Sequence, residues 1–232
     1  MQTPSGWQIL DEERALLVRT YSIGPGNTSN CTVARIRPGE LVVISPATNP
    51  DDAALRELEP FGRVTAIVAP NGFHRSGTPA WAKAFPDAQV LAPARALPRV
   101  RAVAPAALDV ATTAGTLSDG VALLTLPGMR YGETWMVVQA AAGPVWCVSD
   151  TLTNLSAHPF GMGWIMRLLG IGLGLGLNGA QARFMALDKP AYAQWLRERI
   201  AQGSPALLVP AHGALVRRPD LGDRLEELFA RL

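Results

Sequence analysis

The sequence predicts a layered α/β sandwich, and three observations support that class. Short hydrophobic strands recur in both halves of the chain, helices are interspersed among them, and no long polar linker divides the 232 residues. With 48% hydrophobic residues, the chain can bury a substantial core, which argues against disorder. Strands with interspersed helices favour stacked layers over a helical bundle or a pure β fold. We therefore expect a single domain over residues 1–232.

In the first half, three short runs rich in β-branched residues predict strands. Two stretches carry the start signals of helices. A short helix is expected within residues 49–59, which carry two aspartates near their start. A second helix is expected at residues 78–85, with Thr78 as N-cap and Pro79 in the first turn. The strands are expected at residues 41–45, 64–68 and 89–92.

The second half predicts four more strands and two helices. Pro-Gly and Gly-Pro pairs separate the first three strands, as turns between strands do. A charged amphipathic stretch forms the last helix. The strands are expected at residues 121–126, 133–139, 145–149 and 206–209, and the helices at residues 190–202 and 220–232.

Charge and leader signals exclude several classes of partner. The net charge is only +2, so no strong field over the whole chain favours nucleic acid or an acidic membrane. Residues 1–10 lack the basic patch and apolar core of a secretory signal, and acidic residues follow at once. We therefore expect a cytoplasmic protein that binds no nucleic acid.

One cysteine and three of the six tryptophans are expected in the core. Cys31 and Cys147 are too few and too far apart for a disulfide framework or a zinc ribbon. Cys147 lies inside a predicted strand and is interpreted as a packed thiol. Trp81, Trp135 and Trp146 lie in predicted helices or strands and are also expected to be buried.

Three polar residues share one feature, because each follows the end of a hydrophobic strand. They are His74, Asp150 and His212. Strand ends are where loops gather side chains on a rigid frame. Two imidazoles and one carboxylate are a competent ligand set for a divalent metal such as zinc or iron. Their separations along the chain are long, so spacing alone says little.

At these strand ends the sequence resembles the metallo-β-lactamase superfamily, over most of the chain. The family has a His-x-His-x-Asp-His motif, a Pro-Gly-His turn, a Gly-Asp-Thr and a late His-Gly, in that order. The matching segments here are Ala69-Pro70-Asn71-Gly72-Phe73-His74, Pro127-Gly128-Met129, Ser149-Asp150-Thr151 and Ala211-His212-Gly213. The resemblance implies a four-layer αββα sandwich, which agrees with the expected elements.

Departures from the family pattern remove one of its two metal sites. The ligands of the first family site are replaced by Ala69, Asn71 and Met129, and the motif aspartate by Phe73. What remains is three of the four ligands of the other site. The resemblance therefore implies a single metal at His74, Asp150 and His212, zinc first, with iron, manganese or no metal as alternatives.

The activity that follows from the resemblance is hydrolysis, with a metal-bound water as nucleophile and an unidentified small-molecule substrate. Losing the motif aspartate removes a group that would orient that water, and a positioned base contributes typically ~10²–10⁴-fold. Asn71, Glu133 and His158 are the candidates to replace it. Phe73 and Met129 are expected to make the pocket drier.

Other interpretations stay open. One alternative is a catalytically silent relative that binds a ligand, a partner or a membrane surface, and another is an iron protein with redox chemistry. For His74, the alternative is a histidine that hydrogen-bonds only to backbone. For Asp150, the alternative is a carboxylate that caps the following turn through the backbone N–H of Thr151 or Leu152.

One apolar segment, from Phe160 to Leu177, has nearly the length of a membrane span. Its six glycines and the central Arg167 favour a lid-like insertion, at about residues 155–180, over a span. Trp164 is expected on an exposed apolar face. That face, with Met162, Ile165, Met166 and Leu169, would contact a membrane surface or a protein.

Overall fold

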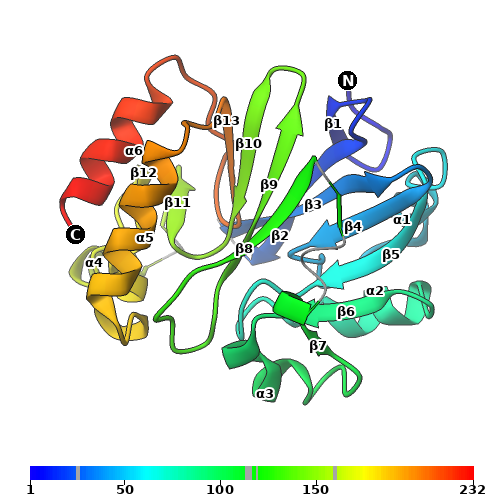
Figure 1. The fold of residues 1–232 in the computed structure, drawn as a ribbon, viewed down its shortest axis with the longest axis horizontal. Helices are drawn as coiled ribbons and strands as arrows, with labels where there is room; N and C mark the ends of the chain where they lie inside the picture. Colours follow the sequence, from blue (N-terminus) through cyan, green and yellow to red (C-terminus); the bar gives the residue numbers. More distant parts are fainter. Residues whose placement is uncertain (25–26, 113–116, 119, 159–160) are drawn as a thin grey trace.

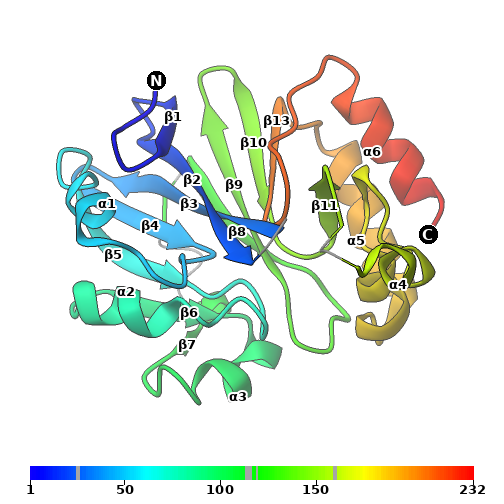
Figure 2. The same cartoon turned by 180° about the vertical axis from the view of Figure 1, so that it is seen from behind.

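Two β-sheets pack face to face with helices on both outer sides in the computed structural model (Figure 1). The structure describes residues 1–24, 27–112, 117–118, 120–158 and 161–232. Phe160, the first residue of the expected apolar segment, lies outside this range. The view from behind shows the same four layers, with both termini at the surface (Figure 2).

The first sheet has seven strands in sequence order. Its first four strands are antiparallel neighbours, and the remaining pairs are parallel. The strands are β1 (Trp7–Asp11), β2 (Leu16–Gly24), β3 (Asn27–Arg37), β4 (Glu40–Ile44), β5 (Arg63–Val68), β6 (Gln89–Ala92) and β7 (Leu108–Asp109).

The second sheet has the order β13-β10-β9-β8, and β13 is parallel to β10. A separate two-stranded hairpin pairs β11 with β12. These strands are β8 (Val121–Thr125), β9 (Thr134–Ala140), β10 (Gly143–Val148), β11 (Leu152–Leu155), β12 (Gly174–Leu177) and β13 (Leu207–Pro210).

Helices lie outside the sheets. The α-helices are α1 (Asp52–Arg56), α2 (Thr78–Ala84), α3 (Leu97–Val100), α4 (Gly163–Leu168), α5 (Lys189–Ala201) and α6 (Leu221–Ala230). The short 3₁₀ helices are η1 (Ala94–Ala96) and η2 (Val110–Thr112), and η4 (Gln181–Met185) is a π-helix. Helices α1, α2 and α3 cover the seven-stranded sheet, and α5 and α6 cover the other (Figures 1 and 2).

Three apolar clusters hold these four layers together. The middle cluster joins the inner faces of the two sheets, for example Val42 to Met136 and Cys147. One outer cluster packs Trp81 of α2 on the seven-stranded sheet, and the other packs α5 and α6 on Trp135 and Trp146. The predicted αββα sandwich and the predicted burial of these tryptophans and of Cys147 are confirmed.

Several features differ from expectation. The elements that were not predicted are β1, β2, β3, β7, β11, β12, α3 and α4. Thr78 is not the N-cap of α2, because Gly77 takes that position and no side chain caps it. A Cβ on residue 77 would lie 2.1 Å from the Pro46 carbonyl oxygen, so only glycine fits at this close approach. Pro79 does lie in the first turn, as predicted.

Among the described residues, no helix combines the length and hydrophobicity that a membrane span requires. The segment expected to form a lid contains α4 and the strand β12. Trp164 and Met162 are exposed, as expected, but the neighbour that shares this exposure is Leu168 and not Leu169.

Candidate metal centre

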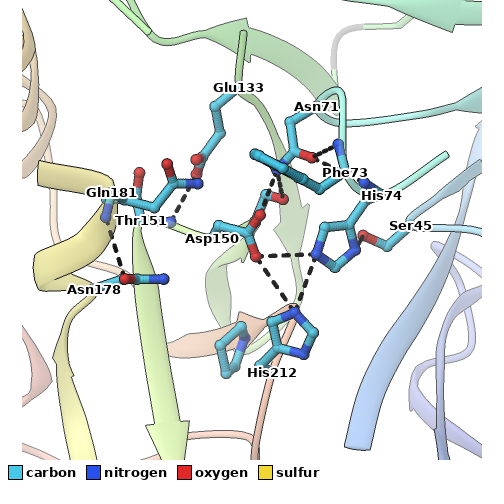
Figure 3. Close-up of polar contacts among 12 residues, drawn as sticks. Ser45, Asn71, Phe73, His74, Glu133, Asp150, Thr151, Asn178, Gln181 and His212 are labelled. Carbon is cyan, nitrogen blue, oxygen red and sulfur yellow. Dashed lines mark hydrogen bonds and ion pairs between the residues drawn. The ribbon is translucent and has the colours of Figure 1, made fainter. Parts of the chain in front are cut away.

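The structure brings together the three residues singled out at strand ends (Figure 3). His74 lies in the loop after β5, Asp150 is the second residue after β10, and His212 is the second residue after β13. Because β10 and β13 are parallel neighbours, their carboxyl ends meet at one edge of the sheet. The ligand atoms of the three side chains all lie within 4.8 Å of one another.

The facing atoms are the Nε2 atoms of both histidines and Oδ1 of the aspartate. His74 Nε2 lies 3.0 Å from Asp150 Oδ1 and 3.1 Å from His212 Nε2. The His212 Nε2 to Asp150 Oδ1 distance is 3.4 Å. Ligands about 2.0–2.2 Å from a tetrahedral zinc ion lie about 3.3–3.6 Å apart. The donor set therefore fits one small divalent cation with little movement.

Hydrogen bonds at the far side of each imidazole orient the rings. His212 Nδ1 donates to the Thr28 carbonyl oxygen at 3.1 Å, which leaves the lone pair on Nε2. His74 Nδ1 lies 3.5 Å from Ser45 Oγ. Ser45 has a φ of 54°, a strained conformation for a non-glycine residue that recurs at functional sites. The His74 ring is thus held by side chains rather than by backbone.

Asn71 ties the His74 loop to Asp150. Its Oδ1 accepts the backbone N–H groups of Phe73 and His74, at 2.8 and 2.9 Å. Its Nδ2 donates to Asp150 Oδ2 at 2.8 Å and to Ser149 Oγ at 2.9 Å. Because Asn71 binds Oδ2 of Asp150, the other carboxylate oxygen, Oδ1, faces the two histidines.

Charges in the cluster favour an ionised aspartate. Burial alone would raise the pKa of Asp150, but His74 and His212 hold it well below its usual range. Burial would lower the pKa of His212, yet the hydrogen bond and charge of Asp150 raise it overall. An anionic carboxylate between two imidazoles attracts a cation.

Glu133 lies behind the cluster and does not join it (Figure 3). Its Oε1 accepts from Trp135 Nε1 at 2.9 Å and from the Thr151 backbone N–H at 3.1 Å. Glu133, and not Asp150, therefore accepts the N–H of Thr151, one of the two groups through which Asp150 was considered to cap the turn. Burial first, and then the charge of Asp150, raise the pKa of Glu133 to about 7.

The remaining candidates have different positions. His158 does not belong to the cluster of ligand atoms within the described part of the chain. Met129 is buried in the outer core and lines neither cavity beside the cluster, so the expectation that it makes the pocket drier is wrong. Phe73 is 43% exposed and lines the cavities beside the cluster.

Only glycine fits at position 213, directly after His212. Its φ is 92°, and a Cβ there would lie 2.0 Å from the Asn154 carbonyl oxygen. Asn30 Nδ2 donates to the carbonyl oxygens of Pro210 and Gly213, at 2.7 and 2.8 Å, and so holds both ends of this loop. The loop geometry gives the late His-Gly pair a physical reason.

Sequence reasoning missed the residues that orient the ligands. Ser45 and Asn30 are ordinary polar residues in or after strands, and Thr28 contributes only its carbonyl oxygen. Asn71, which lies in the same turn as His74, was named from the sequence, but as a replacement for the motif aspartate and not as a residue that orients Asp150. A backbone carbonyl gives no signal in a sequence.

Comparison with known proteins reveals the fold. No known family profile matches the sequence. No curated protein matches it either. Solved structures do match: a metallo-β-lactamase from Erythrobacter litoralis has a TM-score of 0.67 at 14% identity, covering 100% of this chain and 99% of that one.

Two further structures show how the same fold carries different metals. The metallo-β-lactamase FIM-1 from Pseudomonas aeruginosa, in its mono-zinc form, has a TM-score of 0.64 at 9% identity, covering 99% and 96% of the two chains. A flavo-di-iron protein variant from Thermotoga maritima has a TM-score of 0.62 at 12% identity, covering 97% of this chain and 60% of that one. At these identities the likeness establishes the fold alone.

Proposed function

Because the chain has the metallo-β-lactamase fold, we propose that it is a metal-dependent hydrolase with a single divalent metal, zinc by preference. His74 Nε2, His212 Nε2 and Asp150 Oδ1 would hold the ion. The convergence of these three atoms within 4.8 Å is the observation that carries the proposal. Three protein ligands are the usual number in catalytic zinc sites, which keep a position for water or substrate.

The choice of metal follows the donor chemistry and the similar structures. Imidazole and carboxylate ligands suit zinc and iron alike. One similar structure is a mono-zinc form and another is a di-iron protein. A single two-histidine, one-carboxylate site is closer to the mono-zinc case, which supports zinc here.

When bound, zinc supplies a Lewis acid that polarises the scissile bond and lowers the pKa of a coordinated water to about 7. The protein's own part is to orient ligands and exclude water. Asn71 fixes the Asp150 carboxylate, and the Thr28 carbonyl fixes the tautomer of His212. Glu133 is occupied by Trp135 and Thr151, so it supports the turn that carries Asp150 rather than touching substrate.

The test is hydrolysis of a panel of neutral esters and amides by protein purified without chelators. We expect turnover that is lost after dialysis against a chelator and restored by one equivalent of zinc. Asn71→Leu is expected to lower metal affinity about 10–100-fold, as the loss of an outer ligand partner does. Turnover that survives complete metal removal would contradict the proposal.

A second candidate function is binding to an anionic lipid surface, with or without catalysis. Trp164 and Leu168, one helical turn apart on α4, are 70% and 74% exposed. Between Asp150 and Asp188 the sequence has no acidic residue, and its full charges are Arg167 and Arg183. Exposed tryptophan and leucine beside cationic side chains suit a negatively charged bilayer surface.

Flotation with phosphatidylglycerol vesicles tests this candidate. We expect the intact chain to float with the vesicles and the double variant Trp164→Ser/Leu168→Ser to stay in the dense fraction. Leu108→Ser, which removes an exposed leucine from β7, is the matched control and should float. Equal flotation of all three proteins, or of none, would reject the lipid surface.

A further inference from the structure

Two cavities of similar size flank the candidate metal centre. The first has a volume of about 300 Å³ and lies toward β11, α4 and η4. The second has a volume of about 290 Å³ and lies toward β2 and the start of α2. Both are lined by Phe73, Asp150 and His212, so the metal centre lies at their junction. A substrate that reaches the centre can therefore extend to both sides.

The first cavity has an apolar wall. Its described lining contains no charged side chain apart from Asp150 and His212 of the centre. A carboxylate or ammonium group placed deep in it would lose its hydration and meet no opposite charge. The uncharged polar residues that also line it are Asn27, Thr153, Asn178 and Gln181. Its apolar lining residues are Phe73, Leu155, Met166, Ile171, Ala180 and Met185.

The second cavity offers hydroxyl groups instead. Tyr21, Ser29, Thr48 and Ser76 line it, and its described lining has no charged side chain outside the cluster of His74, Asp150 and His212. Hydroxyl groups both donate and accept hydrogen bonds, so they suit an uncharged polar group.

Phe73 stands between the two cavities, at the position where the family motif has an aspartate. Its ring packs edge-on against Tyr131 with centroids 5.1 Å apart, and the Arg99 guanidinium lies 5.0 Å from its centroid. These contacts hold an apolar surface beside the centre where the motif would put a charge. Phenylalanine in place of the motif aspartate therefore favours a neutral substrate.

We infer that the site takes a neutral amphiphile, with an apolar acyl chain in the first cavity and an uncharged hydroxyl-bearing group in the second. This assignment rests on the proposed function for its chemistry, which is hydrolysis of the ester or amide bond between the two parts. The water oxygen bonds to the acyl carbon as the bond to the alcohol or amine breaks. One water proton leaves with that group, and the other stays with the acid.

Binding of uncharged probes tests the assignment without turnover. The probes are 1-octanol and the non-hydrolysable ether 1-O-octylglycerol, titrated calorimetrically below micelle-forming concentrations into chelator-treated protein and again with zinc. The added glycerol hydroxyls should make the ether bind about tenfold more tightly than octanol, the effect of one or two good hydrogen bonds.

Variants assign each part of the probe to its cavity. Ala180→Phe and Met166→Trp narrow the first cavity and are expected to weaken both probes about tenfold or more, because apolar burial is lost. Thr48→Phe, at an exposed position of the second cavity, should reduce the ether to the affinity of octanol and leave octanol unchanged.

The outcomes separate this inference from the metal proposal. Zinc-dependent turnover without octanol binding, or equal affinities in the wild type and both first-cavity variants, would overturn the amphiphile assignment alone. A different outcome is a protein that holds no zinc but binds octanol and the ether, with the affinities of the cavity variants changed as expected. That outcome would support the amphiphile assignment and reject the proposal of a metal-dependent hydrolase.

Discussion

His74→Ala, Asp150→Ala and His212→Ala are each expected to lower the affinity for zinc about a thousandfold or more. Each variant removes one of three ligand atoms that lie 3.0–3.4 Å apart. Loss of an outer partner already costs about 10–100-fold, and loss of a ligand costs more. Competition with a chromophoric chelator measures the change.

Matched controls separate ligand loss from general damage. His158→Ala removes the third histidine, which is outside the ligand cluster, and Asp87→Ala removes an exposed carboxylate. Both controls should bind zinc like the wild type. Wild-type affinity in any of the three cluster variants would mean that the ion, if bound, is held elsewhere.

Glu133→Gln is expected to change how stability depends on pH. The pKa of Glu133 is raised from 4.5 to about 7, so between these values the folded protein keeps a proton that the unfolded chain has released. The free energy of unfolding therefore falls as the pH rises through this window, by about 3 kcal/mol from this group. Glutamine stays neutral and keeps the acceptor for Trp135 and Thr151.

Urea unfolding of chelator-treated protein between pH 4.5 and pH 8 measures this effect. Relative to the wild type, Glu133→Gln should gain about 3 kcal/mol across the range. The surface variant Glu226→Gln is the control and should run parallel to the wild type. A difference between Glu133→Gln and the wild type that stays constant with pH would mean that Glu133 is already ionised at pH 4.5.

The sequence predicted the central strands well, because they are short apolar runs bounded by turn residues. Strands β4, β5, β6 and β8 begin and end within a residue of the expected positions. Strand β3 was not predicted because its buried positions include Ser29, Asn30 and Thr32, which hide the apolar pattern. In β2 the buried residues are confined to its first three positions, and the rest of the strand is half-buried or exposed. The contribution of these strands to the site follows from their pairing. Strand β3, paired with β2, places the Thr28 carbonyl oxygen within hydrogen-bond distance of His212.

The candidate site was predictable as a set of residues but not as a geometry. His74, Asp150 and His212 are far apart along the chain, and only the pairing of β10 with β13 and the packing of the two sheets bring them together. The residues were identified from the sequence because their motifs occur in the same order as in the family. The positions of Asn71, Glu133 and His158 relative to the cluster needed the structure, because they depend on burial and hydrogen bonding.

Zinc titration of the wild-type chain, with metal content measured after gel filtration, tests the central claim most directly. The account predicts one zinc ion per chain, with binding abolished in the double variant His74→Ala/His212→Ala. Two ions per chain, or none at saturating zinc, would contradict a single metal held by His74, Asp150 and His212.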